Sequence, residues 1–196
     1  MRYPALSSAL ILLNTGSSGA FGAMAGDVHE VLKRMRQKAD EHIDLAHCLL
    51  GPTDMIVHVH ANDFETLLRV IDDKIMPLKA ESHNYLSSTE TLIVKRSLAR
   101  EPLSDLHKEP TQLFAWVFGQ TNTTDEDVVD GLMQMDGHIY YGAQVIGRYD
   151  VALLVKADNM DQLMTTIDGT LRKKNFLIST DTRMVLMSKH ELSPPA

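Results

Sequence analysis

The sequence predicts an α+β fold built from two copies of one unit. The segment Gly51-Pro-Thr-Asp54-Met-Ile-Val-His-Val-His-Ala61 reappears 96 residues later as Gly147-Arg-Tyr-Asp150-Val-Ala-Leu-Leu-Val-Lys-Ala157. A repeat of this size indicates a duplicated domain rather than a short solenoid unit. In each half, short apolar runs alternate with segments of helical periodicity, in the order strand, helix, strand, strand, helix, strand.

In the first half, strands are expected at residues 9–14, 46–50, 55–61 and 89–94. The first helix begins at Asp27, because Glu30 follows at the spacing of a capping box. The second helix begins after Asn62 or Asp63 and ends at Pro77. A turn at residues 51–54 joins two antiparallel strands.

The second half repeats this order. Strands are expected at residues 114–118, 140–146, 151–157 and 182–187, with residues 114–118 matching residues 10–14. Thr124 and Asp158 are the expected N-caps of the two helices. The segment 97–112, which contains Pro102 and Pro110, is predicted to be a linker.

The order βαββαβ is that of the ferredoxin-like arrangement, in which one face of the sheet needs a cover. We therefore expect two ferredoxin-like repeats packed sheet to sheet as a pseudo-dimeric α/β barrel. The predicted domains are residues 1–96 and 113–190, with the linker 97–112 between them and a tail at 191–196.

Composition excludes some classes of function. The net charge of −7 argues against direct binding of nucleic acid, which needs a basic face. No apolar run reaches the length of a membrane span. The single Cys48 excludes an internal disulfide and indicates a reducing, cytoplasmic location. Residues 1–25 imitate a secretory signal, with small residues at 23–25, but the repeat favours a strand there.

The hairpin residues suggest a family. The segment from Gly147 through Tyr149 and Asp150 resembles the Gly-x-Tyr-Asp hairpin in the effector-binding domain of Lrp/AsnC (feast/famine) transcriptional regulators. Residues 89–95 look like the terminal strand of that domain, and residues 12–15 are similar to its first strand. The family usually carries a helix-turn-helix, for which we find no segment here. The resemblance therefore implies a tandem effector domain without its own DNA-binding domain.

What the resemblance implies is a stand-alone sensing or regulatory module that binds a small effector, an amino acid in the typical case. Gly147 would admit backbone N–H groups to a carboxylate, Asp150 would bind an ammonium group, and Tyr149 would form an aromatic wall. Further hydroxyl contacts would come from Thr180 and Thr182. The matching positions of the first half are Gly51, Asp54, Thr89 and Thr91. Gly and Asp are also common in tight turns for backbone reasons alone.

Partners and chemistry follow from the same interpretation. We expect the effector, a homo-oligomer or a hetero-assembly with a regulator, no cofactor and no enzymatic activity. His58 and His60 alternate on one strand and share a face, but no acidic third ligand stands at a recognised spacing, so no metal site is predicted. Two alternatives stay open: an interaction module without a ligand, and a dimeric α/β-barrel enzyme, favoured only by these histidines.

Overall fold

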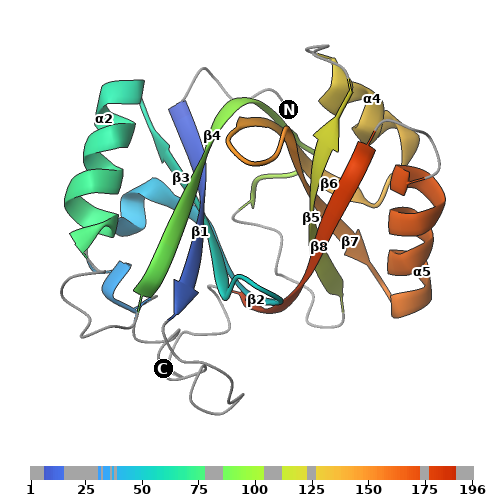
Figure 1. Cartoon of the computed structure of the whole chain (residues 1–196), viewed down its shortest axis with the longest axis horizontal. Helices are drawn as coiled ribbons and strands as arrows, with labels where there is room; N and C mark the ends of the chain where they lie inside the picture. The colour runs from blue at the N-terminus through green and yellow to red at the C-terminus, as the bar shows by residue number, and fades with distance from the viewer. Residues whose placement is uncertain are drawn as a thin grey trace. The chain divides into compact units, whose positions relative to one another are not determined.

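The computed structural model describes residues 7–15, 31, 33–35, 37, 39–77, 86–103, 112–122, 127–172 and 177–188 (Figure 1). The chain divides into two compact units. We call Leu92–Val185 the C-terminal unit, and we call Ala5–Thr91 with the chain after Leu186 the N-terminal unit. Antiparallel strands and a few helices make up both units, which confirms the predicted α+β class. The packing of two repeats sheet to sheet stays a prediction.

The N-terminal unit is built around a three-stranded antiparallel core. Its elements are β1 (Ser7–Thr15), η1 (Asp40–His42), β2 (Ile43–Leu50), β3 (Met55–Ala61), α2 (Phe64–Arg69), η2 (Val70–Ile75) and the first part of β4 (Leu86–Ala99). Strand β3 lies between β1 and β2 and pairs with both. Helix α2 packs on β1 and β3, where Leu67 is fully buried.

The C-terminal unit contains the rest of β4 and seven further elements. These are β5 (Leu113–Thr121), α4 (Val128–Met135), β6 (Ile139–Ile146), β7 (Val151–Ala157), α5 (Met160–Met164), η4 (Thr165–Arg172) and β8 (Leu177–Ser188). The strands lie in the order β8, β5, β7, β6, β4, and all neighbours are antiparallel. The order of β5 to β8 is compatible with the predicted βαββαβ sequence of elements.

One face of this second sheet carries the helices. Alternate strand residues, including Val117 and Leu153, form one buried cluster with Leu132 of α4 and Ile167 of η4. Figure 1 shows α4 and α5 on the same side of these strands. Because side chains alternate along a strand, Trp116, Phe118 and their cross-strand partners face the opposite way.

The two hairpin turns have the same backbone geometry. Gly51 and Gly147 have φ of 147° and 156°. In each turn an amide donates to the Asp carbonyl at 2.8 Å: Leu49 to Asp54, and Val145 to Asp150. Both Asp amides donate in turn to the preceding first strand of their own unit. The duplicated hairpin predicted from the sequence is therefore present at atomic detail.

The first strands align differently from the prediction. Asp54 N donates to Leu13 O, whereas Asp150 N donates to Gly119 O, so Leu13 matches Gly119. The sequence comparison had matched Leu13 with Val117. A shift of two residues keeps every side chain on its predicted face, which explains why the apolar pattern did not reveal it.

Three smaller expectations also need correction or lie outside the described residues. Asp63 caps α2 as one of the two predicted residues, but the cap of α5 is Asn159 rather than Asp158. Residues 97–99, assigned to the linker, belong to β4. The predicted caps Asp27 and Thr124 lie outside the described residues. Within the described part of the chain, no helix has the length and apolar character to cross a membrane.

Candidate functional site

Gly147 and Asp150, which were predicted to bind a ligand, stabilise the backbone of the hairpin turn. The Asp150 carboxylate accepts a hydrogen bond of 2.8 Å from the Thr121 amide at the end of β5. Gly147 takes a backbone conformation that residues with a Cβ rarely adopt. These roles agree with the turn interpretation that was kept open for this Gly–Asp pair.

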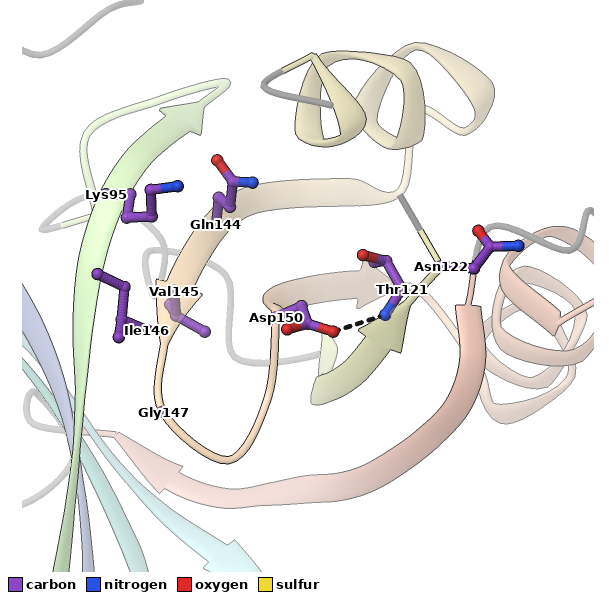
Figure 2. A pocket seen from close by; sticks show the side chains of 8 residues that line it. All are labelled: Lys95, Thr121, Asn122, Gln144, Val145, Ile146, Gly147 and Asp150. Carbon is purple, nitrogen blue, oxygen red and sulfur yellow. Dashed lines mark hydrogen bonds between the residues drawn. The ribbon is translucent and has the colours of Figure 1, made fainter. Parts of the chain in front are cut away.

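A cavity of about 440 Å³ lies beside this turn (Figure 2). Its lining consists of Lys95, Thr121, Asn122, Gln144, Val145, Ile146, Gly147 and Asp150. Figure 2 shows the Lys95 and Asp150 side chains on different sides of the space, with the dashed Asp150–Thr121 bond between β7 and β5. Of the predicted ligand residues, only Gly147 and Asp150 reach the cavity.

The predicted threonines of β8 point elsewhere. Thr182 pairs with Val117, which places both on the helix-covered face. Thr180 accepts a 3.0 Å hydrogen bond from Arg172 Nε. The structure therefore separates these two hydroxyls from Tyr149.

Tyr149 instead joins a buried network with the residues between those threonines. Its hydroxyl donates to Asp181 Oδ2 at 2.7 Å. Arg183 Nη2 donates to the same Asp181 oxygen at 2.7 Å and to the Tyr149 hydroxyl at 3.1 Å. Arg183 is only 2% exposed, and its guanidinium stacks on Phe118 with 5.0 Å to the ring centroid. We call Tyr149, Asp181 and Arg183 the tyrosine network.

The charges of the tyrosine network control its protonation. Burial and the hydrogen bond to Asp181 raise the pKa of Tyr149 above 10.0. Burial alone would raise the pKa of Asp181, but the hydrogen bonds from Arg183 and Tyr149 outweigh it and hold that pKa below 3.8. At neutral pH the network therefore contains a neutral tyrosine, a carboxylate and a guanidinium.

The residues of the N-terminal unit that were predicted to bind a ligand do not line a common site either. Gly51 and Asp54 form the turn, and Thr89 Oγ1 lies 3.6 Å from the Met76 sulfur. Thr91 is half-buried on β4. No cavity described for this part of the chain brings them together, so their ligand role stays a prediction.

Sequence reasoning missed a second cluster in the N-terminal unit. His58 Nδ1 and His60 Nδ1 each lie 3.0 Å from Asp44 Oδ2. His58 is buried, whereas the side chains of His60 and Asp44 are 26% and 31% exposed. His42 accompanies them, with its ring centroid 6.3 Å from that of His60. We call Asp44, His58 and His60 the histidine cluster.

Within the histidine cluster, the pKa values of Asp44 and His60 are shifted in opposite directions. Burial alone would raise the pKa of Asp44, but His58 and His60 outweigh it and hold that pKa well below 3.8. The interaction with Asp44 raises the pKa of His60 above 6.5, against a smaller opposite effect of burial. His60 is therefore a partly exposed imidazole whose protonated form is stabilised by Asp44.

A β-bulge explains why Asp44 was missed. The β2–β3 register shifts between Ile43 and Leu45, so Asp44 has no partner in the ladder. In a regular ladder Asp44 would face away from His58 and His60, because it would lie opposite Val59. A bulge re-aims the extra side chain. In the sequence, the closeness of Asp44 to His58 and His60 was indicated only by their positions on the two strands that the turn joins.

The histidine cluster is not a conventional metal site. Among the described residues, no group of three or more His, Cys, Asp or Glu side chains is arranged to hold a metal ion. His58 Nδ1 is hydrogen-bonded to Asp44 Oδ2, and His60 Nδ1 lies 3.0 Å from the same oxygen. The arrangement therefore suits proton transfer at the partly exposed His60 ring.

Comparison with known proteins gives the fold. No family model and no curated protein matches this sequence. An anthrone oxidase-like protein superposes with a TM-score of 0.58 at 12% identity, covering 96% of this chain and 94% of the other. A siroheme decarboxylase has a TM-score of 0.60 at 9% identity, covering 94% of this chain and 72% of that one. A mutant chlorite dismutase from Candidatus Nitrospira defluvii has a TM-score of 0.59 at 11% identity, covering 95% and 93%.

These neighbours correct the family prediction. They carry the names of enzymes, and none is an Lrp/AsnC regulator. The predicted membership of the Lrp/AsnC family is wrong, and so are the predictions of a regulatory amino-acid sensor and of a protein without enzymatic activity. The predicted regulator partner finds no support among these neighbours. The hairpin signature misled because the turn that it encodes is a backbone requirement of this fold.

Proposed function

We propose that this protein is an enzyme that binds a planar, conjugated small molecule and transfers a proton on it at the histidine cluster. The observation that carries the proposal is the pair of imidazoles bound to one carboxylate oxygen, both at 3.0 Å. The substrate class is suggested by the neighbours, which include the anthrone oxidase-like protein and a siroheme decarboxylase in complex with an iron-uroporphyrin III analogue.

His60 is the proposed catalytic base. Its Nδ1 lies 3.0 Å from Asp44 Oδ2, and its side chain is 26% exposed, which lets a substrate reach the ring. An anthrone has a weakly acidic CH₂ group, and removal of its proton gives an anion that dioxygen can oxidise. The overall change converts CH₂ and O₂ to C=O and H₂O, with dioxygen taking the electrons.

The test uses an anthrone and dioxygen as the substrates. Oxygen uptake and quinone absorbance should both rise above the uncatalysed rate with the wild-type protein. His60→Gln should abolish the increase, and the wild-type rate should climb with pH through a pKa above 6.5, because the base must be unprotonated.

A matched control is available in the other unit. His138 also binds a carboxylate, with Nδ1 2.7 Å from Asp136, but it lies outside the histidine cluster. His138→Gln should therefore retain activity. An unchanged rate in His60→Gln, or no catalysis of any anthrone tested, would contradict the proposed base.

An iron porphyrin is a second candidate ligand, and the residues fit it in one respect. A metal-bound histidine usually has its other ring nitrogen on a carboxylate, as His60 has with Asp44. His60 would hold the iron through Nε2, and Asp44 would increase the electron donation of the ring. Bound iron would supply one-electron chemistry.

Optical titration with ferric protoporphyrin and with iron uroporphyrin III separates the two candidates. A saturable Soret shift that His60→Gln removes and His138→Gln retains would support the porphyrin. Binding that is the same in both variants would exclude His60 as the ligand.

A further inference from the structure

The C-terminal unit contains a continuous row of aromatic rings that ends at the tyrosine network. Tyr149 and Phe118 have ring centroids 5.0 Å apart, Phe118 and Trp116 stack at 6.0 Å, and Trp116 meets Tyr141 edge to face at 5.8 Å. All four residues are buried. We call them the aromatic row.

The fold itself does not require these rings. The matching positions of the N-terminal unit are occupied by Leu10, Leu12, Leu45 and Thr53, which are equally buried. The same strands thus form a core with aliphatic residues in one unit and with aromatic residues in the other.

The arginine at the end of the row is also specific to this unit. In the sequence Asp181 matches Glu90, another carboxylate, whereas Arg183 matches the apolar Leu92. The Arg183 side chain is only 2% exposed, and burying a charge costs desolvation even when its partner, here the 31% exposed Asp181, compensates it. The place of Arg183 beside the Tyr149 hydroxyl therefore indicates a role for that hydroxyl.

We propose that Tyr149 is a redox-active tyrosine and that Trp116 connects it to a one-electron oxidant. When the oxidant removes one electron, the O–H bond of Tyr149 breaks and its proton passes along the existing 2.7 Å hydrogen bond to Asp181 Oδ2. The products are a neutral tyrosyl radical and a neutral carboxyl group, and the oxidant is reduced by one electron. Return of an electron restores both groups.

Asp181 is suited to accept the proton in this step, and Arg183 is suited to stay bound to the tyrosine oxygen. Asp181 is held ionised, so it can accept a proton at neutral pH. Arg183 donates to the tyrosine oxygen at 3.1 Å and keeps that contact when the oxygen becomes a radical. The oxidant is a photogenerated metal complex in the test and an organic radical in catalysis. The proposal does not depend on His60, which belongs to the other unit.

The test is flash oxidation of the purified protein with ruthenium(III) tris-bipyridine, followed by electron paramagnetic resonance. A tyrosyl signal is expected in the wild type and its loss in Tyr149→Phe. In Trp116→Phe the signal should form more slowly, because the step that tryptophan mediates is missing. In Asp181→Asn the radical yield should fall, since the amide cannot accept the proton.

Tyr140→Phe is the matched control. The Tyr140 hydroxyl also donates to a carboxylate, that of Glu101, but its ring lies on Lys156 and outside the aromatic row. This variant should retain the signal. Loss of the signal in Tyr140→Phe, or its survival in Tyr149→Phe, would overturn the proposal. Far-ultraviolet circular dichroism of each variant identifies one that fails to fold. If Tyr149→Phe fails to fold, 3-fluorotyrosine is incorporated at position 149 alone. A changed hyperfine pattern of the radical then supports the proposal, and an unchanged pattern overturns it.

Discussion

Arg96 of β4 and Arg100, the residue directly after β4, bind the two opposite ends of helix α4. Arg96 binds Asp127 at 2.8 Å and also Asp130, both at the N-terminal end. Arg100 donates to the Met133 carbonyl at 2.5 Å and to the Asp136 carbonyl at 3.1 Å, both at the C-terminal end. The second arginine satisfies carbonyls that a helix leaves without partners.

The two arginines should therefore contribute unequally to stability. Arg100→Ala removes charged hydrogen bonds to half-buried carbonyls and should lower the free energy of unfolding by about 1.5–3 kcal/mol. Arg96→Ala breaks one pair whose Asp127 side chain is 75% exposed and a second, half-buried pair with Asp130, and we expect about 0.2–1 kcal/mol for each. Urea unfolding followed by circular dichroism measures both. Equal losses in the two variants would refute the assignment.

Gly147 should not tolerate a side chain. Its φ of 156° is strained for any residue with a Cβ, so Gly147→Ala should cost about 1–3 kcal/mol. Gly137 is the control, because an added Cβ there would meet no atom within 4 Å. Thermal unfolding should separate the two variants, and similar melting temperatures would argue against the turn geometry.

Replacement by alanine should change the free energy of unfolding in opposite directions at Gly142 of β6 and at Gly131 of α4. A Cβ on Gly142 would lie 2.8 Å from Val129 Cγ1, so Gly142→Ala should destabilise by about 1–3 kcal/mol. Gly131 lies within α4 and has open space, so Gly131→Ala should stabilise by about 0.5–1 kcal/mol. Denaturant midpoints give the signs. A stabilised Gly142→Ala protein would mean that α4 packs differently on β6.

The histidine cluster should stabilise the protein within a limited pH range. The folded pKa of Asp44 is lowered, so its contribution is present above 3.8 and lost as the pH falls through the folded pKa. The folded pKa of His60 is raised, so its contribution is full below 6.5 and lost as the pH rises through the folded pKa. The stability difference between wild type and Asp44→Asn should be largest between these values. Urea titrations from acid to mildly alkaline pH test this, and a flat difference would contradict it.

The fold was largely predictable from the sequence, and the candidate sites were not. The repeat and the strand periodicity located β3, β7 and their turns, because buried strands carry strong apolar patterns. The tyrosine network was not predicted, because the family resemblance pointed to the adjacent Thr180 and Thr182 of β8, and Thr182 lies on the helix-covered face. A pattern of period two gives the faces of a strand, but it does not say which face carries function.

The β-bulge that re-aims Asp44 occurs twice. The β6–β7 register shifts between Ile139 and Tyr141, at the positions that match Ile43 and Leu45. The bulged residue there is Tyr140, whose ring lies 4.6 Å from Lys156 Nζ, and Lys156 matches His60. Because a bulged residue is released from the ladder, its identity can change while the strands stay paired. A duplicated scaffold can therefore carry different side chains at the bulge of each unit. Saturation libraries at residues 44 and 140 should retain the fold with far more replacements than libraries at their paired neighbours.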